Sequence, residues 1–187
     1  MDVPIVLLQN TKLFVPVIHR DSRGSFCEVY SKRTLREFGI DVDFVQDNQS
    51  SSLEAGTVRG LHYQSPPFAQ AKLVRVVRGR IHDVVVDVRR GSPTYGQWHK
   101  VELSADGGEQ LFVPEGFLHG FITLEPDTYV IYKVSNYYSR EHDGAVLWND
   151  PDLAIDWGIA ATSVHLSEKD ASAQSFGAFC SPFVYAR

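Results

Sequence analysis

The stretch KLVRVVRGRIHDVVVDV, residues 72–88, carries the clearest fold signal in the chain. Two segments rich in valine, 72–78 and 81–88, flank Gly79 and Arg80. Valine is enriched in strands, and a glycine between two such segments is typical of a tight turn. We therefore predict two β-strands joined by a turn at Gly79 and Arg80.

Further strand signals lie on both sides of this stretch. Downstream, segments of the same character, separated by glycine and proline, span residues 97–103, 109–113, 118–124 and 128–138. Upstream, the weaker candidates are residues 11–19, 25–30, 44–49 and 57–64. Helix signals are confined to residues 31–38, with Ser31 as N-cap and Gly39 as stop, and to residues 167–173. Short strands with polar turns predict a mainly β fold, a jelly-roll barrel with a few short helices, and such barrels often hold a ligand.

The bulk composition is typical of one globular domain, so residues 1–187 are interpreted as a single domain. A net charge of -5 disfavours a general nucleic-acid binder, although a few local Arg and Lys side chains can still bind a small anion. Cys27 and Cys180 form no zinc-binding spacing; two reduced thiols are expected, with one disulfide as the alternative. Because the chain shows neither a signal-peptide pattern nor an apolar run near about 18 residues, we expect a cytoplasmic protein without membrane contact.

Two polar side chains share a face with valines in the predicted strands. Period-two alternation places Lys72 with Val74, and Tyr132 with Val130. Polar groups on the inward face of a barrel are candidates for binding or chemistry. The alternatives are a lysine that points to solvent at a strand end and a packed tyrosine whose hydroxyl is satisfied.

Arg59 and His62 flank Gly60 in the predicted strand 57–64. Strict alternation would direct the two side chains to opposite faces. They can serve one pocket only if Gly60 interrupts the alternation, as a bulge or kink does. A purely structural histidine is the alternative interpretation of His62.

The segment from Gly108 to His119 matches the second motif of the cupin family, G-x5-P-x-G-x2-H. In many cupins that histidine binds a metal. The first cupin motif needs two histidines separated by one residue, and this chain has only His62, with Gln64 where the second would stand. A three-histidine metal site is therefore not expected, and we predict a metal-free cupin barrel.

Several longer motifs together resemble the dTDP-4-dehydrorhamnose 3,5-epimerase family. In chain order they are RDSRGSFCEVY (20–30), FVQDNQS (44–50), TVRGLHYQ through TYGQW (57–98), VPEGFLHGF (113–121), YKVSNYYS (132–139), WNDPDLAIDW (148–157) and LSEKD (166–170). The resemblance implies a double-stranded β-helix (cupin-type) fold and a homodimer, with N-terminal strands at the dimer contact and the C-terminal segment packed on the barrel. It also implies no cofactor, and conversion of dTDP-4-dehydro-6-deoxy-D-glucose to dTDP-4-dehydro-L-rhamnose in dTDP-L-rhamnose biosynthesis.

The resemblance also implies roles for particular residues. His62 is the expected base, Asp170 its orienting partner, Tyr132 the acid, and Lys72 lies near the developing enolate. Substrate contacts are expected from Arg23, Phe26, Glu28, Gln46, Asn48, Arg59, His119, Tyr138 and Lys169. Residues 23–28 are expected to reach the neighbouring subunit's site. Asp143 is a further candidate, although many family members carry the longer Glu at this position.

The expected chemistry suits these residue types. A ketone at carbon 4 makes the protons on carbons 3 and 5 acidic and serves as the electron sink, so no cofactor is required. Inversion needs one group that removes a proton from one face and another that returns it to the opposite face, and each positioned proton transfer contributes roughly 100- to 10,000-fold. An imidazole oriented by a carboxylate is suited to the first role and a lysine to stabilising the enolate.

Three other functions are compatible with parts of this pattern. The first is a related enzyme that epimerises only carbon 3 or carbon 5, or moves the ketone, in deoxysugar biosynthesis. The second is a cupin that binds a sugar nucleotide without catalysis. The third is a metal-dependent cupin oxygenase.

Overall fold

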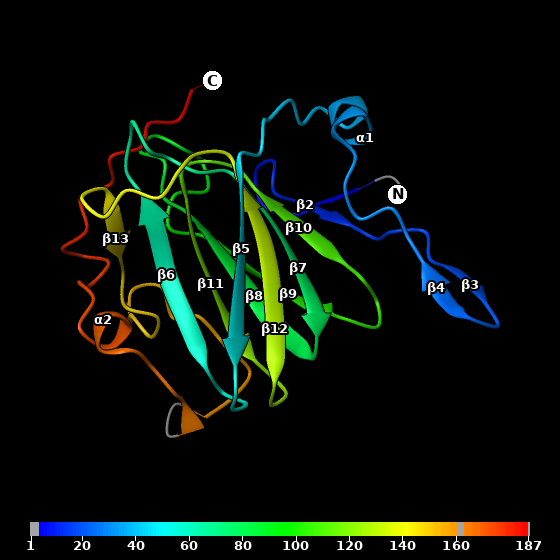
Figure 1. Cartoon of the computed structure of the whole chain (residues 1–187). Helices are drawn as coiled ribbons and strands as arrows, with labels where there is room; N and C mark the ends of the chain where they lie inside the picture. Colours follow the sequence, from blue (N-terminus) through cyan, green and yellow to red (C-terminus); the bar gives the residue numbers. More distant parts are fainter. Residues whose placement is uncertain (1–3, 161–162, 187) are drawn as a thin grey trace.

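The computed structural model describes residues 4–160 and 163–186. It is a sandwich of two antiparallel sheets (Figure 1), one with the strand order β1-β2-β10-β7-β12-β5 and the other β13-β6-β11-β8-β9. A third, two-stranded sheet pairs β3 with β4. The strands are β1 (Ile5–Val6), β2 (Lys12–Phe14), β3 (His19–Asp21), β4 (Gly24–Phe26), β5 (Gln46–Ser52), β6 (Val58–Gln64), β7 (Lys72–Arg78), β8 (Arg80–Asp87), β9 (Trp98–Ser104), β10 (Gln110–Val113), β11 (Phe117–Thr123), β12 (Thr128–Val134) and β13 (Asp143–Ala145).

The turn predicted at Gly79 joins the two strongest strands, as expected, but these strands do not form a hairpin. β7 lies in the six-stranded sheet and β8 in the five-stranded sheet, so Gly79 carries the chain from one sheet to the other. Gly79 has φ +79°, and a Cβ there would come within 2.3 Å of the Thr128 hydroxyl. Glycine is therefore required at this corner.

The strand predicted over 128–138 is too long, because β12 ends at Val134. Beyond Val134, the backbone makes hydrogen bonds with side-chain amides instead of with a neighbouring strand. Gln64 donates to the carbonyl of Tyr137, and its own carbonyl accepts from the N–H of Ser139. Gln70 donates to the carbonyl of Asn136. The weaker strand predictions 11–19 and 25–30 are also too long, since they contain only β2, the first residue of β3 and the last two residues of β4.

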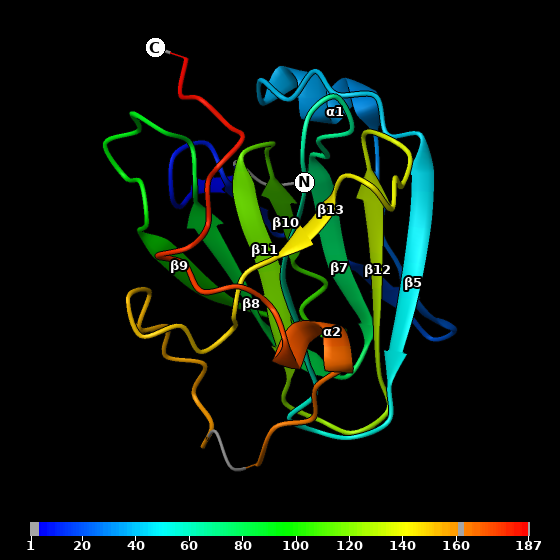
Figure 2. The same cartoon turned by 90° about the vertical axis from the view of Figure 1, so that its left-hand side faces the viewer.

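Both short helices begin at the predicted serine. The Ser31 hydroxyl accepts from the N–H of Thr34 at the start of α1 (Lys32–Glu37), and Gly39 follows the helix with φ +78°. The Ser167 hydroxyl accepts from the N–H of Asp170 in α2 (Glu168–Ala171). Figure 2 shows α2 below β13, the edge strand of the five-stranded sheet that pairs with β6.

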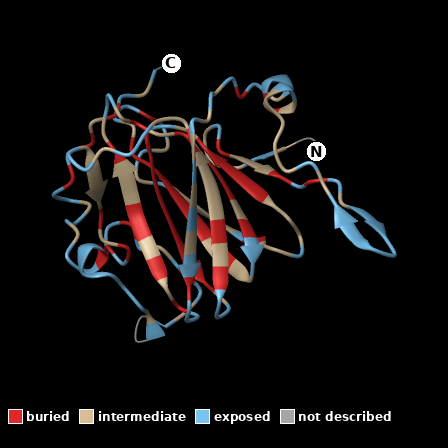
Figure 3. Ribbon diagram, in the orientation of Figure 1, coloured by how far each residue is buried: buried red, intermediate tan, exposed pale blue. Residues whose placement is uncertain are grey.

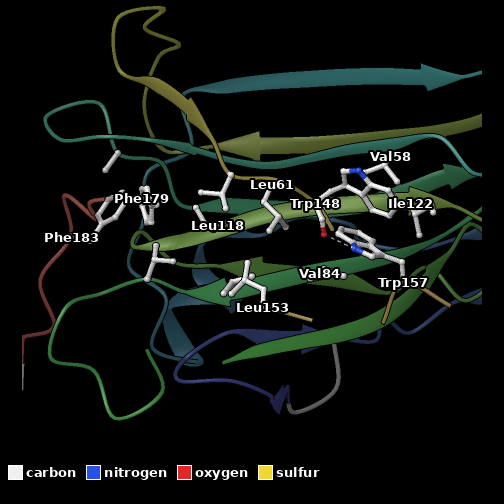
Figure 4. Close-up of a cluster of buried hydrophobic side chains, with 14 residues drawn as sticks. Val58, Leu61, Val84, Leu118, Ile122, Trp148, Leu153, Trp157, Phe179 and Phe183 are labelled. Carbon is white, nitrogen blue, oxygen red and sulfur yellow. Dashed lines mark hydrogen bonds between the residues drawn. The ribbon is translucent and has the colours of Figure 1, made fainter. Parts of the chain in front are cut away.

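Apolar side chains fill the space between the sheets and cover the outer face of the five-stranded sheet. Figure 3 shows buried residues along the strands of both sheets. On that outer face, Trp148 and Trp157 pack over β6 and β11, and the Trp157 indole donates to the Trp148 carbonyl at 2.8 Å (Figure 4). Phe179 and Phe183 extend the same cluster. Within the described residues, no helix is long and apolar enough to cross a membrane.

The β3–β4 hairpin stands away from the sandwich (Figure 1). All six of its strand residues are exposed, and Phe26 is 72% exposed. A large exposed aromatic side chain on such an arm is unusual for an isolated protomer, because its apolar area gains from being covered.

Candidate active site

A cavity of about 430 Å³ lies between the two sheets and receives side chains from both. β6 and β11 line it from the five-stranded sheet, and β5, β7 and β12 line it from the six-stranded sheet. A second hollow of about 290 Å³ shares His62, Lys72, Tyr132 and Lys169 with the first. All four predicted catalytic residues line the first cavity, together with two predicted substrate contacts on β6 and β11. These six are His62, Tyr132, Asp170, Lys72, Arg59 and His119.

The strand β6 directs both Arg59 and His62 into this cavity because its pairing with β11 is bulged at Gly60. His62 pairs with His119, and Arg59 pairs with Phe121, so three steps on β6 match two on β11. Gly60 has φ +124°, and a Cβ there would lie 2.6 Å from the Cα of Gly120. The break in alternation that a shared pocket requires is therefore present, and it needs glycine.

His62 is held by a carboxylate from α2. Its Nε2 lies 2.5 Å from Oδ1 of Asp170, which is 3% exposed. Burial opposes the charge of Asp170, but its hydrogen bonds with His62, Ser167 and the Gly60 N–H lower its pKa below the ordinary value. An ionised carboxylate only accepts, so Nε2 of His62 carries the proton and Nδ1 keeps its lone pair. The imidazole is thereby prepared to act as a base at Nδ1.

Tyr132 enters the cavity from β12, on the sheet opposite His62. Burial raises the pKa of the Tyr132 phenol, against the opposing effect of the Arg59 guanidinium. The phenol therefore stays protonated through the neutral range and can donate a proton.

Lys72 and His119 lie next to each other on the cavity wall, with 3.5 Å between Nζ and Nδ1. Burial lowers the pKa of Lys72 to about 8, although the carboxylates of Asp83 and Asp143 act to raise it. Burial also lowers the pKa of His119, despite its contact with Asp83. Near neutral pH the site thus pairs a cationic lysine with a neutral imidazole.

The sequence reasoning missed Asp83, which contacts His119 Nε2 through both carboxylate oxygens at 3.0 and 2.9 Å. A signal was present, because Asp83 alternates with Ile81 and Val85, which places an acid on the inward face of β8. Among the other lining residues, Ser50 continues the inward face of Gln46 and Asn48 on β5. The remaining residues that were not predicted are Thr57, Val58, Phe121, His165, Leu166 and Ser167.

The smaller hollow contains most of the other predicted substrate contacts. Gln46 and Asn48 project into it from β5, joined by a 2.7 Å hydrogen bond. Asp143 accepts from Lys169 Nζ at 2.5 Å and from the Tyr138 hydroxyl at 3.2 Å. Asp143, Lys169 and Tyr138 therefore form one connected cluster at the mouth of the site.

Arg23, Phe26 and Glu28 line neither hollow of their own protomer. Arg23 sits at the tip of the β3–β4 arm and pairs with Asp21 at 2.6 Å. Glu28 is exposed and lies 3.5 Å from the Thr34 hydroxyl. Any contact of these three with a substrate would have to be made in another copy of the chain.

Over the described residues, no group of three or more His, Cys, Asp or Glu side chains is arranged to hold a metal ion. His119, the residue that the cupin motif would assign to a metal, is instead bound to Asp83 and lies beside Lys72. That the site works without a metal or other cofactor stays a prediction.

Comparison with known proteins identifies the family. The family model described as dTDP-4-dehydrorhamnose 3,5-epimerase matches residues 6–178. The chain belongs to the dTDP-4-dehydrorhamnose 3,5-epimerase family. Its members include the dTDP-4-dehydrorhamnose 3,5-epimerase of Sinorhizobium fredii, which is 52% identical over 168 residues, covering 90% of this chain and 86% of that one. The family resemblance predicted from the motifs is confirmed.

Two solved structures of the family are close to this one. The dTDP-4-dehydrorhamnose 3,5-epimerase of Bacillus anthracis, with TDP and PPi bound, has a TM-score of 0.86 and 51% identity, covering 89% of this chain and 94% of that one. The dTDP-6-deoxy-D-glucose-3,5-epimerase of Legionella pneumophila, in complex with dTDP-4-keto-L-rhamnose, has a TM-score of 0.92 and 41% identity, covering 98% of both chains. The predicted mainly β, cupin-type fold is confirmed.

Proposed function

We propose that this chain is a dTDP-4-dehydrorhamnose 3,5-epimerase that converts dTDP-4-dehydro-6-deoxy-D-glucose to dTDP-4-dehydro-L-rhamnose. The observation that carries the proposal is the entry of His62 and Tyr132 into one cavity from opposite sheets. A sugar ring bound between them would present one face to a base and the other to an acid. Family membership at 52% identity supports the same reaction.

The proton balance of each epimerisation follows from these two groups. Nδ1 of His62 removes the proton from the carbon next to the ketone, and the electron pair of that C–H bond moves onto the ketone oxygen as an enolate. The enolate then collapses and takes a proton from the Tyr132 hydroxyl on the opposite face. The imidazolium returns its proton, through solvent, to the tyrosinate before the second carbon reacts. Asp170 stabilises the imidazolium in the interval.

The enolate oxygen needs a positive partner, which we assign to the Lys72 ammonium. Lys72 and His119 lie together on the cavity wall, and a fixed positive charge is more effective in a partly buried cavity than in bulk water. Arg59 lines the same cavity and can bind oxygen atoms of the substrate.

The nucleotide end of the substrate is assigned to the smaller hollow. The diphosphate is anionic, and Lys169 at the boundary of the two hollows offers a positive charge to it. Tyr138 is 59% exposed and offers a flat face for the thymine ring. Gln46 and Asn48 offer amide groups to the base or the sugar.

The deciding experiment is incubation with dTDP-4-dehydro-6-deoxyglucose in deuterated water, followed by NMR at carbons 3 and 5. Deuterium at both carbons with inversion supports the proposal, and label at one carbon only indicates a single-position epimerase. A moved ketone indicates a ketoisomerase, and nucleotide binding without exchange indicates a binding protein.

His62→Ala should abolish exchange while dTDP affinity is kept. His99→Ala, on β9 and away from both hollows, is the matched control.

We further propose a single domain, a cytoplasmic location and a homodimer whose β3–β4 arms reach the partner's site. The exposure of Phe26 and the absence of Arg23 and Glu28 from the lining of their own cavities support the reach of the arms into a partner's site. The test mixes His62→Ala chains with Arg23→Ala chains under conditions of subunit exchange. If the arm acts in the partner's site, each heterodimer contains one intact site and activity returns. If activity does not return although mixed dimers form, the arm does not act across the interface.

A further inference from the structure

Asp83 is a carboxylate inside the apolar layer between the sheets. It is 0% exposed and lies on the inward face of β8, with Ile81 and Val85 on either side. It does not line either hollow of the active site. A buried charge is retained only when it is paired, and the partner here is His119 Nε2 at 2.9 and 3.0 Å.

Asp83, His119 and Lys72 form a line from the core to the cavity wall. Because Asp83 accepts at Nε2, His119 carries its proton there and leaves Nδ1 as an acceptor. Lys72 Nζ lies 3.5 Å from that Nδ1. The carboxylate therefore determines which nitrogen of His119 faces Lys72.

We propose that Asp83 is a positioning residue for the epimerisation: through His119 it fixes the Lys72 ammonium at the cavity wall and supplies the buried negative charge that balances it. The inference rests on the proposed function, because the role of Lys72 there is to stabilise an enolate. It goes beyond that function, since Asp83 lines neither hollow and lies behind the cavity wall formed by His119.

The electrostatic surroundings of Lys72 explain why this countercharge matters. Burial lowers the pKa of Lys72 to about 8, and Asp83 is the leading group that acts in the opposite direction. Asp143 adds to the effect of Asp83, while Lys169 opposes it. The charged and titratable side chains that line the cavities with Lys72 are Arg59, His62 and Tyr63 on β6, His119 on β11, Tyr132 on β12, Tyr138 beyond β12, Asp143 on β13, His165 before α2, and Lys169 and Asp170 on α2.

Asp83→Asn tests the charge with little change in shape, because the amide oxygen can still accept from His119 Nε2. Without the negative charge the pKa of Lys72 falls below about 8, so the lysine is neutral at a lower pH than in the native protein. The alkaline limb of the pH–rate profile should then move to lower pH. At pH values above this limb, the lysine of the variant is neutral and activity should fall. The loss should approach the roughly 100- to 1,000-fold that follows removal of one such stabilising donor.

Two further variants separate positioning from stability. Asp87→Asn is a matched control, because Asp87 is also on β8 and also 0% exposed, but pairs with Arg89 away from the cavity. It should destabilise the fold without moving the alkaline limb. Asp83→Glu keeps the negative charge and should leave the limb near its native position.

A second measurement does not depend on turnover. The ¹³Cε resonance of Lys72, titrated by NMR in the native protein and in Asp83→Asn, reports the lysine's protonation directly. A lower midpoint in the variant supports the inference even if the enzyme proves to act on another substrate. Equal midpoints and an unmoved alkaline limb would overturn it. If Asp83→Asn does not fold, the titration is done on Asp83→Glu instead. A Lys72 midpoint equal to that of the native protein then supports the inference. A Lys72 midpoint lower than that of the native protein overturns it.

Discussion

His62 and Tyr132 enter the same cavity from opposite sheets, His62 from β6 and Tyr132 from β12. The two strands belong to different sheets, and no local sequence pattern pairs them. A bound ring between the two side chains has a base on one face and an acid on the other, which is the geometry that inversion of a carbon centre requires.

Removal of the Tyr132 hydroxyl should separate exchange from inversion. In Tyr132→Phe the base is intact, so protons next to the ketone still exchange with deuterated solvent. Inverted product should fall by roughly 100- to 10,000-fold because the second face has lost its donor. NMR of carbons 3 and 5 measures both processes together. Tyr129→Phe, on the same strand and lining neither hollow, should behave as the native enzyme. Full inversion by Tyr132→Phe would refute the assignment of the acid.

Loss of the Asp170 charge should weaken the base without removing it. In Asp170→Asn the amide cannot stabilise the imidazolium and no longer fixes the proton on Nε2 of His62, so kcat should fall by roughly 100- to 10,000-fold. KM should change little, because the carboxylate is engaged by His62. Steady-state kinetics and NMR of the imidazole nitrogens are the measurements. Glu168→Gln, exposed on the same helix, is the control.

Activity of the native enzyme should decline as pH rises through about 8, the pKa to which burial lowers Lys72. The sign follows from the charge: the ammonium present below this pH stabilises the enolate, and the neutral amine above it does not. Tyr132 does not cause this limb, since its pKa is raised above the ordinary phenol value. Lys72→Arg, which stays charged, should lack the limb whatever its maximal rate. A limb that persists in Lys72→Arg belongs to another group.

An alanine at Gly60 should disrupt both the fold and the site. The added Cβ would meet the Gly120 backbone at 2.6 Å and the His119 carbonyl at 2.8 Å, and neither can move as a flexible side chain would. We expect a loss of about 1 to 3 kcal/mol from this overlap, in addition to the penalty for a positive φ. Gly91→Ala, with φ +84° and open space around it, measures the φ penalty alone. Denaturant unfolding gives both values, and equal losses would argue against a tight contact at Gly60.

Substitution of Lys169 should affect binding more than chemistry. Lys169→Met removes the positive charge from the boundary of the two hollows, so dTDP affinity should fall by roughly 10- to 100-fold, as expected for a charge-assisted hydrogen bond. Exchange at saturating substrate should be nearly unchanged. Calorimetric titration with dTDP at two salt concentrations measures the effect, which should shrink at high salt. Lys100→Met, whose lysine pairs with Asp156 outside the hollows, is the control.

The sequence by itself determined the type and approximate position of most elements. Valine-rich segments predicted β7 and β8, and Ser31 and Ser167 marked both helix starts, because these signals are local. Long ordered motifs identified the family. They also named His62, Tyr132, Lys72 and Asp170 without any knowledge of where each side chain points.

Only the tertiary structure decided which side chains meet. Alternation places residues on the faces of one strand, but the face that becomes the cavity depends on pairings between strands distant in the chain. The bulge at Gly60, which turns Arg59 and His62 to the same side, exists only against β11. Asp83 was hidden for the same reason: an acid in a valine-rich strand gains its meaning from His119, 36 residues away, which burial and hydrogen bonding bring to within 3 Å.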